Sequence, residues 1–443
     1  MSRNMPRHRE AIGAHQLAEL RRLLPVLLEH NAFYRERLAD AGVSGGTGGT
    51  GAIESLDDFT ARVALTTKAE LAADQDAHPP YGTNLSFPID QYTRLHQTSS
   101  TTGRPLRWLD TTASWSWLLE GWIEVLRAAG LGPGDRLFAA FSFGPFIGFW
   151  MGFEAAARLG CLAIAGGGMT SITRLRVILA NEVTALCCTP TYAIRLGEVA
   201  REERLDLSRS RVRTIIVGGE PGGSLPAVRG RIESTWPGAR VFDHHGMTEI
   251  GPATYECPKR PGVLHLLERS LFCEFIDPAT GAAVADGADQ IAELVVTTLG
   301  RDGSPLLRYR TGDLVRPGPL EPCACGRHER TLLGGIIGRA DDMIFIRGVN
   351  LYPSAVEQLI RELPGVAEYR VEISEHRGMH ELKVMIEPSA DAADHAGLEH
   401  QVAAAFRGAY NLRVPIEIVP VQTLPRFELK ARRWIRCGAE QPA

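Results

Sequence analysis

The sequence lacks the features of several protein classes. It contains no uncharged apolar run of about 18 residues or more, the length a membrane-spanning helix needs. Residues 1–9 are basic but have no apolar signal-peptide core. Lys and Arg number 48 against 52 Asp and Glu, so there is no positive excess for nucleic acid or an anionic membrane. The eight cysteines are too sparse for a secreted disulfide framework. We therefore expect a soluble, cytoplasmic protein without nucleic-acid or membrane partners.

The chain is long enough for two or more domains, because it has 443 residues and an ordinary hydrophobic content of 44%. Helical apolar spacing covers residues 8–42 and ends at a Gly/Thr-rich stretch, 45–51, that is typical of a loop. Short apolar β-prone runs then alternate with helical patterns up to about residue 250; examples are 137–141, 185–188 and 214–217. This alternation favours an α/β fold with a largely parallel sheet.

Two changes of pattern follow towards the C-terminus. Strand-like segments at 271–276 and 292–297, separated by turns, predict a β-rich subdomain at about 255–335. Beyond residue 341 we expect a compact α+β unit, with strands at 343–346, 369–373 and 381–386 and helices at 354–361 and 397–409. We place the boundary at 338–342, which gives an N-terminal domain of residues 1–338 and a C-terminal domain of residues 339–443.

A hydroxyl-rich loop is the strongest local signal for phosphate binding. Backbone N–H groups, hydroxyls and a guanidinium in one turn can hold polyphosphate oxygens. The Walker spacing is absent, and Ser/Thr-rich stretches are also common surface linkers. The loop consists of Thr98, Ser99, Ser100, Thr101, Thr102, Gly103 and Arg104.

Further motifs follow this loop in a fixed order. They are Gly218-Gly219-Glu220-Pro221, His245-Gly246-Met247-Thr248-Glu249, Tyr309-Arg310-Thr311-Gly312-Asp313, Gly338-Arg339-Ala340-Asp341-Asp342 and Lys430. Together with the loop they resemble the core motifs of the adenylate-forming superfamily, which includes acyl-CoA synthetases, adenylation domains and luciferases. Residues 33–38, 346–354 and 430–433 are most similar to the phenylacetate-CoA ligases.

This resemblance implies both a fold and a reaction. The fold is a large N-terminal domain of layered α/β sheets with a β-rich subdomain, followed by a small, mobile α+β C-terminal domain. The reaction uses ATP and Mg²⁺ to activate a small carboxylic acid, which we expect to be aromatic, as an acyl-AMP, and then transfers the acyl group to coenzyme A.

The resemblance also assigns catalytic roles. Glu249 would hold Mg²⁺ against the phosphates, with Thr248 beside the α-phosphate. Arg339 would lie near the ribose and phosphates. Lys430 would reach the α-phosphate and the attacking carboxylate during adenylation. Two anions must approach each other in this step, so neutralisation of their charge dominates catalysis.

Nucleotide binding is assigned in the same way. Asp313 resembles the carboxylate that accepts both ribose hydroxyls, a role that suits a two-oxygen acceptor. His245 stands where a tyrosine commonly lies against adenine. The remaining residues expected at the nucleotide are Gly219, Glu220, Pro221, Gly246 and Met247.

Rotation of the C-terminal domain is implied as well, because the two half-reactions need different groups at one site. Asp341 resembles the hinge. The rotation would withdraw Lys430 and bring in Arg347 and Gly348 to guide the pantetheine of coenzyme A.

The acid pocket is expected beside the adenylate, since aromatic walls with glycines that leave room suit a flat ring. The alternative is that these phenylalanines belong to the core. A hydroxyl or amino substituent of the acid could contact His244. The expected pocket residues are Phe141, Phe146, Gly167, Gly218 and His244.

Other functions fit part of this pattern. The acyl acceptor could be a carrier-protein thiol or an amine, because the first half-reaction is common to all these enzymes. Arg104 where lysine is usual and His245 also leave open an inactive nucleotide-binding sensor. Retention of Glu249, Asp313, Arg339 and Lys430 together favours an enzyme. Leu429 stands in place of a glycine before Lys430. A homodimer is common among similar ligases.

A separate group of residues has the chemistry of a zinc site. Cys257 and His265 form a Cys-x₇-His pair, and Cys323 and Cys325 form a Cys-x-Cys pair. Four such ligands can hold a structural, tetrahedral Zn²⁺ with no open position, and some phenylacetate-CoA ligase relatives are similar here. The alternatives are free cysteines under a loop, or His328 as a ligand.

Overall fold

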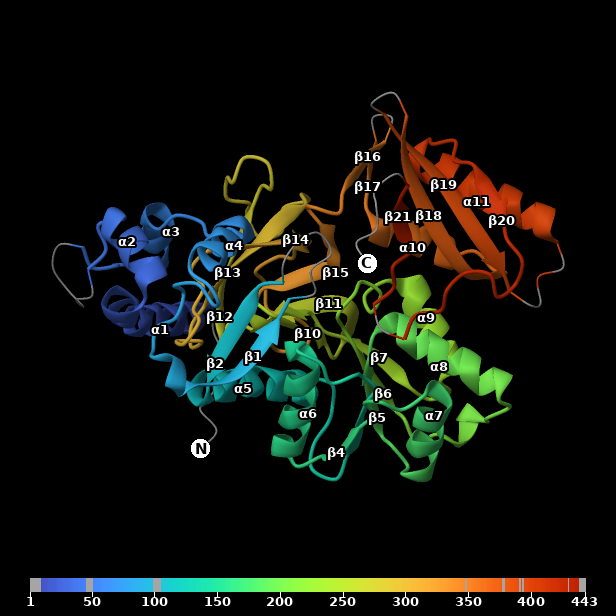
Figure 1. The fold of residues 1–443 in the computed structure, drawn as a ribbon, viewed down its shortest axis with the longest axis horizontal. Coiled ribbons are helices and arrows are strands. Elements are labelled where there is room, and N and C mark those ends of the chain that lie inside the picture. The colour runs from blue at the N-terminus through green and yellow to red at the C-terminus, as the bar shows by residue number, and fades with distance from the viewer. Residues whose placement is uncertain are drawn as a thin grey trace.

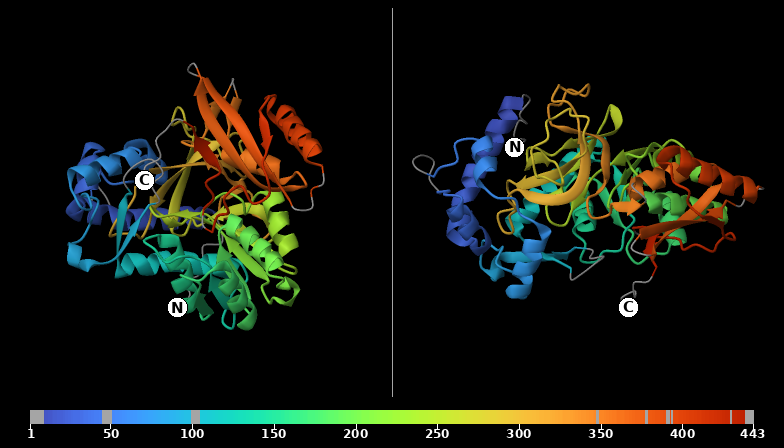
Figure 2. Two further views of the ribbon diagram at one scale, coloured as in Figure 1. Left: turned by 45° about the vertical axis from the view of Figure 1, so that its right-hand side comes forward. Right: turned by 90° about the horizontal axis from the view of Figure 1, so that it is seen from above.

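The computed structural model describes residues 9–44, 51–98, 105–346, 349–376, 379–389, 392, 394–428 and 430–437. Within these ranges no helix is both long and apolar enough to cross a membrane. The elements up to β15 form a large N-terminal part, and the later ones form a smaller part that lies over α8 and α9 (Figure 1). Figure 2 shows the same division from two further directions.

A five-stranded parallel sheet lies in the N-terminal part. Its order is β4 (Leu162–Ala165), β3 (Arg136–Ala139), β5 (Ala185–Cys188), β6 (Thr214–Val217) and β7 (Arg240–Asp243). Every residue of β5 and β6 is buried, as expected for short apolar strands in a covered parallel sheet. The associated helices are α6 (Ile147–Leu159), α7 (Ser171–Ala180), α8 (Pro190–Glu202) and α9 (Pro226–Thr235). The carboxyl ends of all five strands therefore lie at one edge, which is where ligands bind in open α/β sheets.

A six-stranded antiparallel sheet packs a second core beside the first. Its order is β10 (Thr254–Cys257), β11 (Arg260–Leu266), β15 (Thr331–Arg339), β14 (Tyr309–Pro317), β13 (Ala292–Thr298) and β12 (Leu271–Ile276). The small pair β8 (Gly246–Met247) and β9 (Gly251–Pro252) connects the two sheets along the chain.

The N-terminal segment folds as helices followed by a hairpin and one long helix. These are α1 (Arg9–His30), α2 (Ala32–Asp40), α3 (Leu56–Arg62), α4 (Lys68–Ala77), β1 (Tyr92–Gln97), β2 (Arg107–Thr111) and α5 (Thr112–Ala128). The single helical pattern over residues 8–42 divides at Asn31, whose side chain accepts a hydrogen bond from the Tyr34 amide and caps α2.

The C-terminal part has its own apolar core between residues 344 and 414. Its elements are β16 (Ile344–Ile346), β17 (Val349–Leu351), α10 (Pro353–Arg361), β18 (Val366–His376), β19 (Met379–Pro388), α11 (His395–Tyr410), β20 (Ile416–Ile418) and β21 (Trp434–Arg436). The last four strands form one sheet in the order β20-β19-β18-β21.

The expected fold class is confirmed: layered α/β sheets, a β-rich region and a small α+β unit at the C-terminus. The strands expected at 185–188, 214–217 and 271–276 have those bounds. The strand expected at 137–141 ends two residues earlier, at Ala139, and the strands expected at 369–373 and 381–386 extend further at both ends because they pair as one long hairpin.

Candidate active site

Asp313 lies buried in β14 between two basic side chains. The register pairs it with Arg339 of β15, whose Nη1 donates to Oδ1 at 3.2 Å. Burial alone would raise the pKa of the Asp313 carboxyl. The nearby His245, Arg339 and Lys430 have a larger opposite effect, so this pKa lies below its ordinary value. Nε2 of His245 lies 2.9 Å from Oδ2, yet neither atom has a hydrogen bond of acceptable geometry. Asp313 is thus a buried, ionised acceptor that lies beside Arg339 and His245.

Gly312 must be a glycine for this arrangement. Its φ is +76°, and a Cβ there would lie 2.9 Å from Nη2 of Arg339. Gly312 therefore leaves space for the Arg339 guanidinium, which contacts Asp313.

Glu249 follows β8 and is 4% exposed. The hydroxyl of Tyr309 lies 3.5 Å from its Oε1 and donates to it, and Nζ of Lys68, the first residue of α4, lies 3.6 Å from the same atom. The sequence did not single out Lys68, because its approach to Glu249 is visible only in the folded chain. The site therefore contains an ammonium group from the N-terminal helices.

Arg301 holds the backbone on which Glu249 is carried. Its Nη1 donates to the carbonyls of Thr248 at 2.8 Å and Glu249 at 2.7 Å. Its Nε and Nη2 donate to the two oxygens of Asp110, each at 2.7 Å. Both side chains of this pair are fully buried. The pair, which is also absent from our sequence expectations, fixes the turn that presents Thr248 and Glu249.

Lys430 comes from the C-terminal part and lies beside the loop after β6. A Cβ at Gly219, where φ is +89°, would be 3.5 Å from Cε of Lys430. The Ala431 amide donates to Oε2 of Glu220 at 2.7 Å, and Oε1 accepts from the Thr191 amide at 2.9 Å. Desolvation lowers the pKa of Lys430, with Glu220 and Glu249 acting in the opposite direction.

The remaining nucleotide residues are only partly described. Thr98 is buried and its hydroxyl accepts from the Leu106 amide at 3.0 Å. Gly246 approaches β9 so closely that a Cβ would lie 2.7 Å from the carbonyl oxygen of Gly251. Pro221 is exposed and Met247 half-buried. The predicted residues that lie outside the described ranges are Ser99, Ser100, Thr101, Thr102, Gly103, Arg104, Arg347, Gly348 and Leu429.

Two of the expected acid-pocket residues, Gly218 and His244, lie in contact. A Cβ at Gly218 would be 2.8 Å from the His244 carbonyl oxygen. Nδ1 of His244 is 2.8 Å from the Thr254 carbonyl, and burial lowers the pKa of the imidazole to about 4. The ring is therefore neutral, and donation from Nδ1 leaves Nε2 as an acceptor. The Trp122 ring lies against it at 4.4 Å between centroids, and the buried Trp122 indole N–H has no hydrogen bond.

The other expected pocket residues differ in their burial. Phe141 is buried in the core of the parallel sheet, whereas Phe146, at the start of α6, is 37% exposed. A Cβ at Gly167 would be 3.0 Å from the Phe143 ring and 3.4 Å from the Phe141 carbonyl oxygen.

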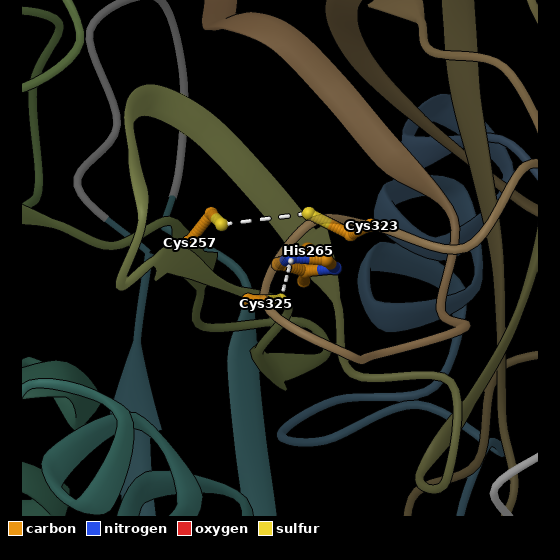
Figure 3. A group of neighbouring side chains, drawn as sticks. All are labelled: Cys257, His265, Cys323 and Cys325. Atoms are coloured by element: carbon orange, nitrogen blue, oxygen red, sulfur yellow. Dashed lines mark hydrogen bonds between the residues drawn. The ribbon is translucent and has the colours of Figure 1, made fainter.

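The predicted metal ligands come together across the β-rich sheet (Figure 3). Their ligand atoms all lie within 4.8 Å of one another, and the group includes His265 rather than His328. Sγ of Cys257 is 3.6 Å from Sγ of Cys323, and Sγ of Cys325 is 3.4 Å from Nε2 of His265. Thiolates on one tetrahedral Zn²⁺ would be about 3.8 Å apart. Burial lowers the pKa of His265 to about 4, so the imidazole is neutral, as a metal ligand must be.

Comparison with known proteins identifies the family. The AMP-binding enzyme model matches residues 56–297, more than half of the chain, and the AMP-binding enzyme C-terminal domain matches residues 348–436. The chain belongs to the AMP-binding, adenylate-forming enzymes. It is 31% identical over 442 residues to the phenylacetate-coenzyme A ligase of Thermus thermophilus, covering 95% of each chain, and 28% identical over 438 residues to that of Escherichia coli, covering 96% of this chain and 94% of the relative.

This chain is not equally similar to two solved states of one related ligase. Its TM-score is 0.90 against a 2-hydroxyisobutyryl-CoA ligase in the postadenylation state, at 29% identity with 99% of this chain and 94% of that one covered. Against the same ligase in the thioesterification state it is 0.71, at 31% identity with 98% and 90% covered. The arrangement thus resembles the postadenylation state more closely.

We predict that Arg301 is a major contributor to stability. Replacing it by Met leaves Asp110 buried and unpaired, which should lower the free energy of unfolding by about 3–5 kcal/mol in urea denaturation. Arg301→Met combined with Asp110→Leu should recover part of this loss, because no buried charge remains unpaired. Arg22 is the control: it makes a bidentate pair with Asp302, but its side chain is 44% exposed. Arg22→Met should therefore lower the free energy of unfolding by less than about 1 kcal/mol. Equal losses in the two single variants would contradict the prediction.

Proposed function

We propose that this enzyme uses ATP and Mg²⁺ to activate a small aromatic monocarboxylic acid as an acyl-AMP and then transfers the acyl group to the thiol of coenzyme A. The observation that carries the proposal is the convergence of Asp313, Arg339, Glu249 and Lys430 from distant segments at one edge of the parallel sheet.

The adenylation step joins two anions, so each residue is assigned by the charge it meets. Lys430 would contact the α-phosphate and the acid carboxylate, and Arg339 would add charge near the ribose and phosphates. Asp313 would accept the ribose hydroxyls with its two carboxylate oxygens. Glu249, held by the Arg301-bound turn, supplies a carboxylate oxygen, the ligand type that Mg²⁺ prefers, and Thr248 would lie beside the α-phosphate.

The remaining nucleotide assignments follow the same loops. The chain after β6 would pass along the adenine at Gly219, Glu220 and Pro221, with His245, Gly246 and Met247 on the other loop. The phosphate loop, residues 98–104, would hold the β- and γ-phosphates. The Glu220 carboxylate also accepts a hydrogen bond from the Ala431 amide. This contact supports a second role for Glu220, in docking the segment that carries Lys430.

The pocket chemistry supports an acid with a ring and a polar substituent. Trp122 and His244 present aromatic surface. The Trp122 indole N–H has no hydrogen bond, and the neutral His244 ring has an acceptor nitrogen at Nε2. Relatives are named for phenylacetate and for 2-hydroxyisobutyrate. An aryl acid with a hydroxyl or amino group uses both features, with Phe141, Phe146, Gly167 and Gly218 as the other proposed pocket residues.

The C-terminal domain is proposed to rotate between the half-reactions about Asp341, beside the domain boundary at 338–342. Asp341 accepts from Arg339 at 2.9 Å and is largely exposed, so few contacts oppose a change of its backbone. Arg347 and Gly348 would then guide the pantetheine of coenzyme A.

Carboxylate-dependent exchange of pyrophosphate into ATP tests the proposed function. With a panel of aryl, hydroxy and short aliphatic acids, we expect exchange to be fastest with a substituted aryl acid and, on adding coenzyme A, a thioester of the corresponding mass. Exchange without a thioester would favour a carrier-protein or amine acceptor. ATP binding without exchange for any acid would show a nucleotide-binding sensor instead.

Lys430 is predicted to act in only one half-reaction. Lys430→Ala should slow exchange by about 10²-fold or more, because the reacting anions lose their mobile cation. Thioester formation from supplied acyl-AMP and coenzyme A should change less than about threefold. Lys383→Ala, which removes an exposed ammonium paired with Glu417, is the control and should change neither rate. A similar loss in both half-reactions for Lys430→Ala would contradict this role.

We further propose that Cys257, His265, Cys323 and Cys325 hold a structural Zn²⁺. Elemental analysis of the purified chain should find about one zinc per protomer, because four ligands complete a tetrahedral site. Cys323→Ser should lower that content and the melting temperature. Cys437→Ser, at an exposed thiol outside the group, should change neither. The zinc proposal would be contradicted if the purified wild-type chain contained no zinc and Cys323→Ser had the same melting temperature as wild type.

A further inference from the structure

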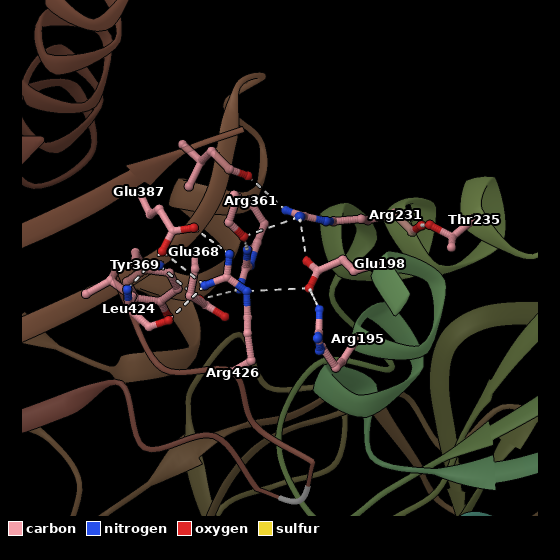
Figure 4. A network of polar contacts seen from close by, with 12 residues as sticks. Arg195, Glu198, Arg231, Thr235, Arg361, Glu368, Tyr369, Glu387, Leu424 and Arg426 are labelled. Atoms are coloured by element: carbon pink, nitrogen blue, oxygen red, sulfur yellow. Dashed lines mark hydrogen bonds and ion pairs between the residues drawn. The ribbon is translucent and has the colours of Figure 1, made fainter. Parts of the chain in front are cut away.

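Arg231 of α9 reaches from the N-terminal part to the backbone of the C-terminal part (Figure 4). Its Nη1 donates to the Val366 carbonyl at 3.0 Å and its Nη2 to the Ala367 carbonyl at 3.3 Å. Both acceptors lie at the start of β18. A guanidinium that donates to two successive carbonyls fixes position and orientation together, which a single point charge does not.

Glu198 of α8 makes another contact between the two parts. Its Oε2 lies 3.5 Å from Nε of Arg426, and its Oε1 lies 3.7 Å from Nη2 of Arg231. Its own helix contributes Arg195, whose Nη1 is 3.3 Å from Oε2. Glu198 therefore lies between an arginine of its own domain and an arginine of the other, as Figure 4 shows.

Arg426 connects this contact to the segment that carries Lys430. Its guanidinium binds Glu387 of β19, which also accepts from the amides of Gln422 and Leu424, each at 2.9 Å. The chain from Gln422 to Arg426 is thus tied to one carboxylate, and it leads directly to Lys430.

The Arg231 contact is connected to the same segment from the other side. Directly after Ala367, the carboxylate of Glu368 accepts from Nε of Arg433 at 2.7 Å and from Nη2 of Arg361 at 2.9 Å. Arg433 follows Lys430 by three residues. The carbonyls held by Arg231 and the residues flanking Lys430 therefore belong to one hydrogen-bonded unit.

The contact is suited to reversible use. Glu198 is 19% exposed and Arg231 28%, and their ionic contacts are longer than ordinary hydrogen bonds. Burial, with the nearby Arg361 charge, lowers the pKa of Arg231 to about 10, so the guanidinium gains solvation when the parts separate. The polar contacts of Arg231 and Glu198 favour the docked state, and the solvation that Arg231 loses opposes it. The difference in free energy between the docked and released states is therefore small.

We propose that Arg231 and Glu198 are positioning residues for adenylation: they dock β18 and Arg426 so that Lys430 lies at Gly219, and they release this contact when the C-terminal domain rotates. Neither side chain is assigned to the nucleotide or the acid. The proposal rests on the proposed two-step function, and it adds the residues that select the first of the two arrangements.

The test separates the two half-reactions in the full-length enzyme. Arg231→Ala should slow carboxylate-dependent pyrophosphate exchange by about tenfold, because the arrangement with Lys430 in place is less populated. Thioester formation from supplied acyl-AMP and coenzyme A should stay within about twofold of wild type or rise. Glu198→Gln should also lower the ratio of the exchange rate to the rate of thioester formation, by a smaller factor.

Two variants of α8, the helix of Glu198, serve as controls. Arg201→Ala removes an exposed arginine, and Glu202→Gln removes a carboxylate that pairs with Arg195 of the same helix. Both should leave the ratio of the half-reaction rates unchanged. Equal slowing of both half-reactions by Arg231→Ala, or no change in either, would overturn the proposal.

A measurement independent of turnover distinguishes this proposal from the proposed function. The Ala431 amide donates to Glu220 across the two parts. Without substrates, its hydrogen exchange should be faster in Arg231→Ala than in Arg201→Ala, at equal melting temperature. Wild-type protein inactive with every acid would refute the proposed function, whereas unchanged protection in Arg231→Ala would refute the docking role.

Discussion

The guanidinium of Arg301 joins three parts of the fold that meet at the active site. It binds Asp110 of the N-terminal hairpin, lies in the loop between β13 and β14, and holds the carbonyls of Thr248 and Glu249 after the parallel sheet. A fully buried ion pair tolerates little displacement, because any lost hydrogen bond leaves a charge without solvent. The position of Glu249 is therefore set by a contact made entirely inside the protein.

The ion pairs of Glu198 between the two parts differ in kind from this buried pair. Arg231, Glu198 and Arg426 meet at distances of 3.5 and 3.7 Å and retain access to solvent. Under the proposed mechanism, rigid placement of Glu249 and reversible placement of Lys430 would use the same residue types at different burial. An enzyme that performs two reactions at one site needs both.

The cysteine cluster is connected to the site through α5. Arg327, next to the Cys323 loop, binds Glu124 of α5 at 2.9 Å, and the same helix carries Trp122 against His244. A metal at the cluster would order this loop and so support the helix that forms one wall of the proposed acid pocket. The contribution of such a metal would be to structure, since four protein ligands leave no position for a substrate.

The sequence alone determined the features that consist of consecutive residues, namely single strands and motifs. Short apolar runs predicted β5 and β6 because strands of a covered parallel sheet need little else. The ordered motifs predicted the family because each is a short stretch of consecutive residues or a single residue. Tertiary structure alone decided the contacts between distant segments. Asp110 and Arg301 are 191 residues apart, and Lys68, Arg231 and Glu198 belong to no motif. An isolated lysine, arginine or glutamate has the same local pattern whether it is solvated or paired, so only the fold, by bringing the partners together and excluding water, gives these residues their role.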